Sequence, residues 1–234
     1  MHSERIEEVF EFAVHGQWYN EPMEFNLIGI IFLIFALVMA LTLHEFAHAW
    51  MSDYLGDRTA RQEGRLSINP LVHIDPFMTL LLPATLILLH SPVIFGAAKP
   101  VPFNPWAVRY GKWGAAMVAA AGPAMNLLLA VFFALWLRFL PVSVEFIPLF
   151  ITIISINIAL MVFNLIPLPP LDGSRIVYAA VPPIRDLFDR LERSGLLIVF
   201  AILLLAGPLF IPFISALVGA ILHLLVSGLS ALST

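Results

Sequence analysis

The sequence predicts an all-α polytopic membrane protein with about four to five transmembrane helices, a re-entrant segment and a short membrane-associated β element. Hydrophobic residues make up 60% of the 234 residues and charged residues 12%, whereas soluble domains are about 45–50% apolar and about 25% charged. Apolar stretches recur from residue 25 to residue 229. We therefore expect one membrane-embedded domain over residues 25–234, with its core over 25–175 and C-terminal helices over 184–229.

An acidic leader over residues 1–24 precedes this domain. It carries six glutamates against one arginine, whereas a secretory signal peptide begins with a basic segment followed directly by an apolar core. The leader is therefore not expected to be a signal peptide. Two alternatives stay open for it, a short amphipathic helix at the membrane surface and a polar segment before the first span.

The first half of the domain contains one clear span and one interrupted apolar segment. Residues 25–51 are apolar for longer than the roughly 20 helical residues that cross a bilayer. Residues 52–75 are polar, and the alternation within residues 64–69 predicts a strand. Residues 77–98 are apolar but contain two prolines, which favours a segment that enters the membrane and returns.

The second half predicts two further spans, over residues 114–137 and 146–166. A charged helix lying on the membrane surface is expected at residues 186–193. The apolar C-terminal stretch 196–226 is broken by a Gly-Pro pair and a further proline. Both a helical hairpin and a single kinked span remain open there.

The basic residues indicate the orientation, because Lys and Arg accumulate in cytoplasmic loops. Ten of the twelve lie in three polar segments, and all three reach one face only if residues 77–98 are re-entrant. The connection 138–145 then lies on the opposite face. The ten residues are Arg58, Arg61, Arg65, Lys99, Arg109, Lys112, Arg175, Arg185, Arg190 and Arg193.

The sharpest chemical feature is the run His44-Glu45-Phe46-Ala47-His48 near the end of the first span. Two histidines four residues apart lie on one helix face and can hold a single zinc ion. Glu45 lies beside them, where it could accept a proton from an activated water. The alternative is a helix end whose polar residues reach the headgroup layer, although ionisable residues within a span are costly.

Catalytic zinc usually has three protein ligands, and this chain has no cysteine. Asp172 is the candidate for the third, since it follows a proline-rich segment after the 146–166 span and precedes Gly173, which permits an unusual backbone angle. Irregular backbone at membrane depth is tolerated where it lines a cavity. A proline-rich loop with a solvated aspartate is the alternative. Asp172 can meet the histidines only if residues 77–98 do not cross, as the charges also require.

These motifs together resemble the site-2 protease family of intramembrane zinc metalloproteases (peptidase family M50), in its small branch without a PDZ domain. The resemblance covers about residues 25–195 and implies one zinc ion per chain at His44, His48 and Asp172, with Glu45 as the catalytic base. Many relatives have an extra span before the histidine helix, which this chain replaces by its acidic leader. The motifs are His44–His48, Asn164-Leu165-Ile166-Pro167, Leu171-Asp172-Gly173, Ala121-Gly122-Pro123-Ala124-Met125-Asn126, and the branch-typical runs 56–61 and 69–76.

Several other polar residues have two interpretations each. Asn126 could bind substrate or stabilise an oxyanion, or make a hydrogen bond between helices. Asn164 could bind the substrate backbone or the carbonyls that the prolines free. Asn157 has the same two interpretations, with the structural one favoured. His73 is either a functional residue near the mouth of the site or a structural or solvated histidine.

The resulting functional expectation is hydrolysis of peptide bonds in or near transmembrane segments of membrane-protein substrates, that is, regulated intramembrane proteolysis. The strand at residues 64–69 could hold an unwound substrate by adding a strand edge. We expect an integral protein of a prokaryotic cell membrane, with the site near the cytoplasmic face. The expected partners are the lipid bilayer and the substrate, no nucleic acid is expected, and a homo-oligomer is left open. The alternative is a zinc-binding protein without proteolysis, either a pseudoprotease or a metal transporter.

Overall fold

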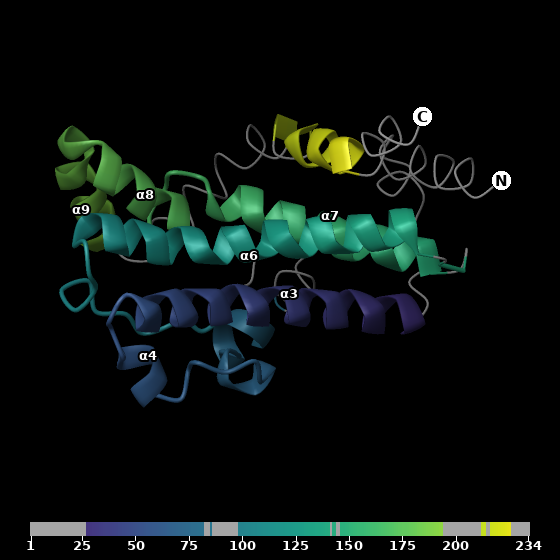
Figure 1. Ribbon diagram of the computed structural model, residues 1–234, viewed down its shortest axis with the longest axis horizontal. Coiled ribbons are helices and arrows are strands. Elements are labelled where there is room, and N and C mark those ends of the chain that lie inside the picture. Colours follow the sequence, from purple (N-terminus) through teal and green to yellow (C-terminus); the bar gives the residue numbers. More distant parts are fainter. Residues whose placement is uncertain are drawn as a thin grey trace. The chain divides into compact units, whose positions relative to one another are not determined.

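The computed structural model describes residues 27–81, 85, 98–140, 142–143, 146–193, 212–213 and 216–225 (Figure 1). Within these ranges the regular structure is helical and contains no strand. Three helices are long and apolar enough to cross a membrane: Phe32–Tyr54 within α3 (Leu27–Tyr54), α6 (Lys112–Phe139) and α7 (Ile147–Asn164). They lie where the sequence predicts its three clear spans.

The remaining elements are short. The charged helix predicted at residues 186–193 is present as α9. The leader 1–24, most of 77–98 and most of 196–229 lie outside the described residues. The short elements are α4 (Thr59–Gln62), the 3-10 helices η1 (Pro70–Val72) and η4 (Pro182–Ile184), the π-helical η2 (Pro76–Leu81), α8 (Asp172–Ala180), α9 (Arg185–Arg193) and an apolar helix Ala216–Leu225.

The chain divides into two compact units, which α3 and α6 both enter. The first unit comprises Met1–Ala40, Asn126–Val162 and Phe213–Thr234. Its core is the contact between α6 and α7, where small Ala130 and Ala134 on α6 let the isoleucines of α7 approach closely. The isoleucines recur at one-turn spacing along a single face of α7. They are Ile147, Ile151, Ile154 and Ile158.

One buried polar contact also joins α6 and α7 in this unit. The amide nitrogen of Asn126 donates to the side-chain oxygen of Asn157 over 2.9 Å, and the amide nitrogen of Asn157 donates to the Ile153 carbonyl over 2.9 Å. Both asparagines are fully buried. The hydrogen bond between helices, one of the two interpretations of Asn126, is therefore present.

The second unit comprises Leu41–Met125 and Phe163–Pro212. It is organised around Asp57, which is buried at the turn after α3. One carboxylate oxygen accepts from Ser52 Oγ over 2.9 Å and from the Asn104 backbone N–H over 2.8 Å. The other accepts from the backbone N–H and hydroxyl of Thr59. A single carboxylate thus joins the end of α3, the start of α4 and the loop that leads to α6.

The strand predicted over residues 64–69 is wrong. These residues form turns and irregular backbone, because the side chain of Arg65 is turned inward and its guanidinium donates to the carbonyls of Lys99 and Pro100. Arg65 is buried, whereas Ile68 is 68% exposed, the reverse of what the alternating pattern requires. The Ser67 carbonyl is likewise engaged, 2.8 Å from Nε2 of His73.

The two ends of the segment 74–98 meet in the second unit. The backbone N–H of Lys99 donates to the carbonyl of His73 over 2.8 Å, and Arg65 holds the carbonyls of Lys99 and Pro100 beside it. His73 and Lys99, the residues that flank this segment, therefore lie next to each other.

Asp57 generates a stability prediction. Burial alone would raise the pKa of Asp57, but the hydrogen bonds from Thr59, Asn104 and Ser52 outweigh burial and hold the pKa below its ordinary value. The stabilisation is fully present above the ordinary carboxyl pKa of about 3.9 and is lost as the pH falls through the lower folded-state pKa. Asp57→Asn should lower the free energy of unfolding by about 2 kcal/mol at pH 7 and flatten its dependence on pH below about 4.

The measurement is the thermal unfolding midpoint in detergent between pH 3 and pH 7. Asp53→Asn is the control, because the Asp53–Arg61 ion pair involves an exposed arginine and such pairs contribute about 0–1 kcal/mol. An equal effect of the two substitutions would contradict the role given to Asp57.

Candidate metal centre

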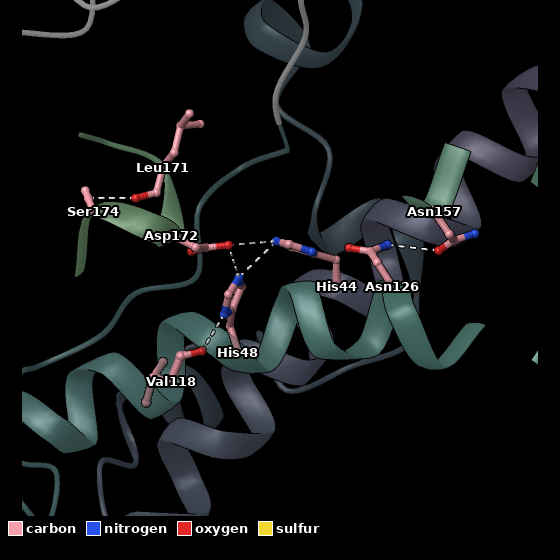
Figure 2. A network of polar contacts seen from close by, with 8 residues as sticks. All are labelled: His44, His48, Val118, Asn126, Asn157, Leu171, Asp172 and Ser174. Atoms are coloured by element: carbon pink, nitrogen blue, oxygen red, sulfur yellow. Dashed lines mark hydrogen bonds and ion pairs between the residues drawn. The ribbon is translucent and has the colours of Figure 1, made fainter. Parts of the chain in front are cut away.

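The two histidines of the HExxH run lie one turn apart on α3, and both are buried. Their ring centroids are 4.6 Å apart, with the ring planes nearly perpendicular. The Nε2 atoms of His44 and His48 face each other at 3.0 Å (Figure 2). An α-helix places residues four apart on one face, so this geometry follows directly from the sequence spacing.

The orientation of His48 is set by α6. Its Nδ1 lies 2.7 Å from the carbonyl oxygen of Val118 (Figure 2). A carbonyl only accepts hydrogen bonds, so Nδ1 carries the proton, and Nε2 of the neutral ring keeps its lone pair for a metal. A backbone group of the neighbouring helix thereby selects the tautomer that can act as a ligand.

Asp172 reaches the histidines from the first residue of α8. Its Oδ2 lies 3.3 Å from Nε2 of His44 and 3.3 Å from Nε2 of His48. Asp172 was predicted to lie on an irregular segment, but that segment comprises residues 165–171 and ends just before it. The aspartate lies at a helix N-terminus, where the helix dipole stabilises a negative charge.

Gly173 has a different role from the one expected. It does not have a positive φ; it lies inside the first turn of α8, against the backbone of the segment after α7. A Cβ at this position would be 2.2 Å from the Leu165 carbonyl oxygen and 2.7 Å from that of Ile166. Glycine is needed because α8 begins in direct contact with this backbone, and that contact brings Asp172 to the histidines.

The three ligand atoms fit a single metal ion. Within the described ranges, one group of His, Cys, Asp or Glu side chains has such an arrangement, and it is formed by His44, His48 and Asp172. A tetrahedral zinc with ligands at about 2.0–2.1 Å requires ligand atoms about 3.3 Å apart, and the observed separations are 3.0, 3.3 and 3.3 Å. Moreover, Asp172 Oδ2 is buried without a hydrogen-bond partner among the described residues. This is expected of an oxygen that binds a metal ion.

The other predicted site residues are not part of this three-residue group. Glu45 is partly buried on α3, next to His44. Asn164 is the last residue of α7 and is partly buried. Asn126 belongs to the first unit and is hydrogen-bonded to Asn157. His73 is buried at the end of η1, with Nε2 on the Ser67 carbonyl, so it is not a solvated loop histidine.

Two residues of α6 that touch the site were given no role from the sequence, although Gly122 belongs to the quoted run Ala121–Asn126. Val118 contributes only its backbone carbonyl, which no side-chain pattern reveals. Gly122 lies against both histidine rings, since a Cβ there would be 2.4 Å from Nε2 of His48 and 2.6 Å from Nε2 of His44. A glycine within an apolar span is a signal of close approach, and Gly122 could have been found on that ground.

Comparison with known proteins places this site in a family context. A model of peptidase family M50 matches residues 141–207, which include Asp172. "Putative zinc metalloprotease YwhC" of Bacillus subtilis (strain 168) is 38% identical over 182 residues, covering 74% of this chain and 79% of the relative.

Two mycobacterial proteins also match, and the chain spans less than two thirds of their length. "Putative zinc metalloprotease Rip2" of Mycolicibacterium smegmatis is 33% identical over 68% of this chain and 59% of the relative. The protein of the same name from Mycobacterium tuberculosis (strain ATCC 25618 / H37Rv) is 31% identical over 66% and 58%. No solved structure matches the chain. On the family model and the extended similarity to YwhC, the chain belongs to peptidase family M50.

Proposed function

We propose that this integral membrane protein is an intramembrane zinc metalloprotease that hydrolyses peptide bonds in or near transmembrane segments of its substrates. The observation that carries the proposal is the convergence of His44, His48 and Asp172 on one point. Two of these ligands belong to a helix long and apolar enough to cross a membrane. The names of the relatives, zinc metalloproteases, agree with this chemistry.

The division of roles follows from the residue types. Zinc, when bound, polarises a carbonyl and lowers the pKa of a bound water to about 7. His44, His48 and Asp172 hold the ion, and the Val118 carbonyl keeps His48 in the tautomer that can bind it. Glu45 is not one of the three clustered ligands, and it follows His44 directly in the chain. It is therefore the group that accepts the proton of the attacking water and returns it to the leaving nitrogen.

The depth of the site in the membrane is small. His48 precedes the end of α3 at Tyr54 by six residues, or roughly 9 Å of helix. Trp50 and Tyr54 are exposed at that end and their rings stack at 5.8 Å, which is typical of side chains at the headgroup level. Water therefore needs only a short path to the ion, and we place this end of α3 at the cytoplasmic face because of the basic residues around it.

The same face receives both ends of the segment 74–98. Their hydrogen bond between Lys99 and His73 supports a re-entrant segment, because a single crossing would separate its ends by the thickness of the bilayer, about 30 Å. With that segment re-entrant, α6 is the crossing that separates α3 from α7, and Asp172 follows α7 on the face where α3 ends.

A zinc-binding protein without proteolysis is the competing function. A transporter requires sites along a path across the membrane, whereas in the described residues the candidate ligands gather at one point. A pseudoprotease would keep the histidines but would not need Glu45 as a base. Variants at Asp172 and Glu45 separate these cases.

The first prediction concerns the metal. The purified wild-type protein should hold about one zinc per chain, and Asp172→Ala should weaken zinc binding by more than the roughly 10- to 100-fold that loss of an outer hydrogen-bond partner costs. Asp186→Ala, at an exposed position in α9, is the control and should retain the ion. Elemental analysis during titration with a chelator measures both, and full zinc retention by Asp172→Ala would remove Asp172 from the ligand set.

The second prediction separates catalysis from binding. Glu45→Gln keeps the size of the side chain but removes the base, so the cleavage rate should fall by about 10²–10⁴-fold while zinc content and thermal midpoint stay unchanged. Glu63→Gln, at an exposed position beyond α4, should cleave normally.

The assay for this prediction compares membrane-protein fragments between membranes that contain wild-type protein and membranes that contain Glu45→Gln. Fragments that vanish in the variant identify substrates. Cleavage at the wild-type rate by a zinc-loaded Glu45→Gln protein would refute the mechanism, and the absence of any fragment from the wild type would favour the non-proteolytic alternative.

The third prediction tests the topology in this cysteine-free chain. Single cysteines at Arg61, Arg109 and Arg190 should react with a membrane-impermeant thiol reagent from the cytoplasmic face. A cysteine at Ser143 should react from the opposite face. Labelling of positions 61 and 109 from different faces would mean that residues 77–98 cross the membrane.

A further inference from the structure

Gly122 on α6 lies directly against both histidine ligands. An ideal Cβ at Gly122 would lie 2.4 Å from Nε2 of His48, 2.6 Å from Nε2 of His44 and 2.6 Å from Cε1 of His44. Real Cβ atoms essentially never come within 3.0 Å of another group. All three nearest atoms belong to the imidazoles, so the bare Cα of Gly122 faces the ligand nitrogens themselves.

The same turn of α6 contacts His48 twice. Val118, four residues before Gly122, accepts the hydrogen bond from Nδ1 of His48, and Gly122 lies against the Nε2 edge of the same ring. Residues four apart lie on one face of a helix. The Val118 carbonyl therefore holds Nδ1 of the His48 ring. Nε2 of the same ring can approach His44 only because position 122 carries no side chain.

We propose that Gly122 is a positioning residue of the metal centre, whose missing side chain allows Nε2 of His44 and Nε2 of His48 to converge on one ion. A methyl group at this position would push at least one ring off α6, breaking either the 3.0 Å approach of the two nitrogens or the contact of His48 with Val118. This inference rests on the proposed function, because it assumes that the converging atoms bind a metal.

Helix propensity and the proposed clash predict opposite effects of Gly122→Ala on stability. Alanine is a better helix former than glycine, so Gly122→Ala should stabilise α6 if nothing opposed the methyl group. Gly219 provides a matched control, because it lies in the helix Ala216–Leu225 and a Cβ there would meet none of the described residues within 4 Å. Gly219→Ala should therefore keep zinc and should not lower the thermal midpoint.

The experiment measures zinc affinity by competition with a chelator in the full-length wild type, Gly122→Ala and Gly219→Ala. We expect Gly122→Ala to bind zinc at least about 10- to 100-fold more weakly, the range seen when the groups that orient metal ligands are lost. The visible spectrum of the Co²⁺-substituted protein, which reports coordination geometry, should change in Gly122→Ala and remain unchanged in Gly219→Ala. Wild-type affinity and an unchanged spectrum in Gly122→Ala would overturn the inference.

A second background covers the case in which Gly122→Ala folds poorly. The thermal midpoints of chains with and without Gly122→Ala are compared in the wild type and in a His44→Ala/His48→Ala background, where the rings that the methyl group would strike are absent. We expect the loss of stability in the wild type alone. An equal loss in both backgrounds would show that Gly122 serves helix packing and would overturn the inference. A wild type that binds neither zinc nor cobalt refutes the proposed function, and the change in midpoint caused by Gly122→Ala in each of the two backgrounds then still decides whether Gly122 positions the rings.

Discussion

The approach of three side-chain atoms to about 3 Å of one another is the constraint on which the candidate metal centre depends. Side chains alone do not produce it. The carbonyl of Val118 orients His48, and glycines at two positions let backbone lie against the site, Gly122 beside the imidazoles and Gly173 beside the carbonyl of Leu165. A side chain at either glycine would collide with these groups, so the centre is preorganised by one carbonyl and by two positions that lack a side chain.

The elements that follow from local sequence were predictable. Continuous apolar runs gave α3, α6 and α7 within a few residues, because a bilayer core demands about 20 apolar residues of helix. The spacing of His44 and His48 placed both rings on one face, as found. Asp172 could be singled out because a third ligand was missing and because it lies between a proline-rich segment and Gly173. Its position at the start of α8 was not predicted, because the irregular segment was expected to include Asp172, whereas the helix begins at this residue.

The failures occur where long-range contacts override a local pattern. Leu66 and Ile68 alternate with polar residues as in a strand, but the buried residue is Arg65, whose guanidinium binds backbone carbonyls far along the chain at Lys99 and Pro100. An alternating pattern cannot reveal that an arginine will find such partners. For Asn126 both interpretations were reasonable, and the hydrogen bond to Asn157 became visible only when α6 and α7 were paired.

The position of Asp172 in the chain has a consequence for biosynthesis. A ribosome completes the two histidines with α3 and must still produce α6 and α7 before it reaches the carboxylate at the start of α8. A nascent or truncated chain that ends before α8 has Glu45 and the two imidazoles but lacks Asp172, so on the proposed ligand set it should hold the metal only weakly. In the proposed function, the order of the ligands in the chain therefore means that the three-ligand centre can form only after α6 and α7 have been synthesised.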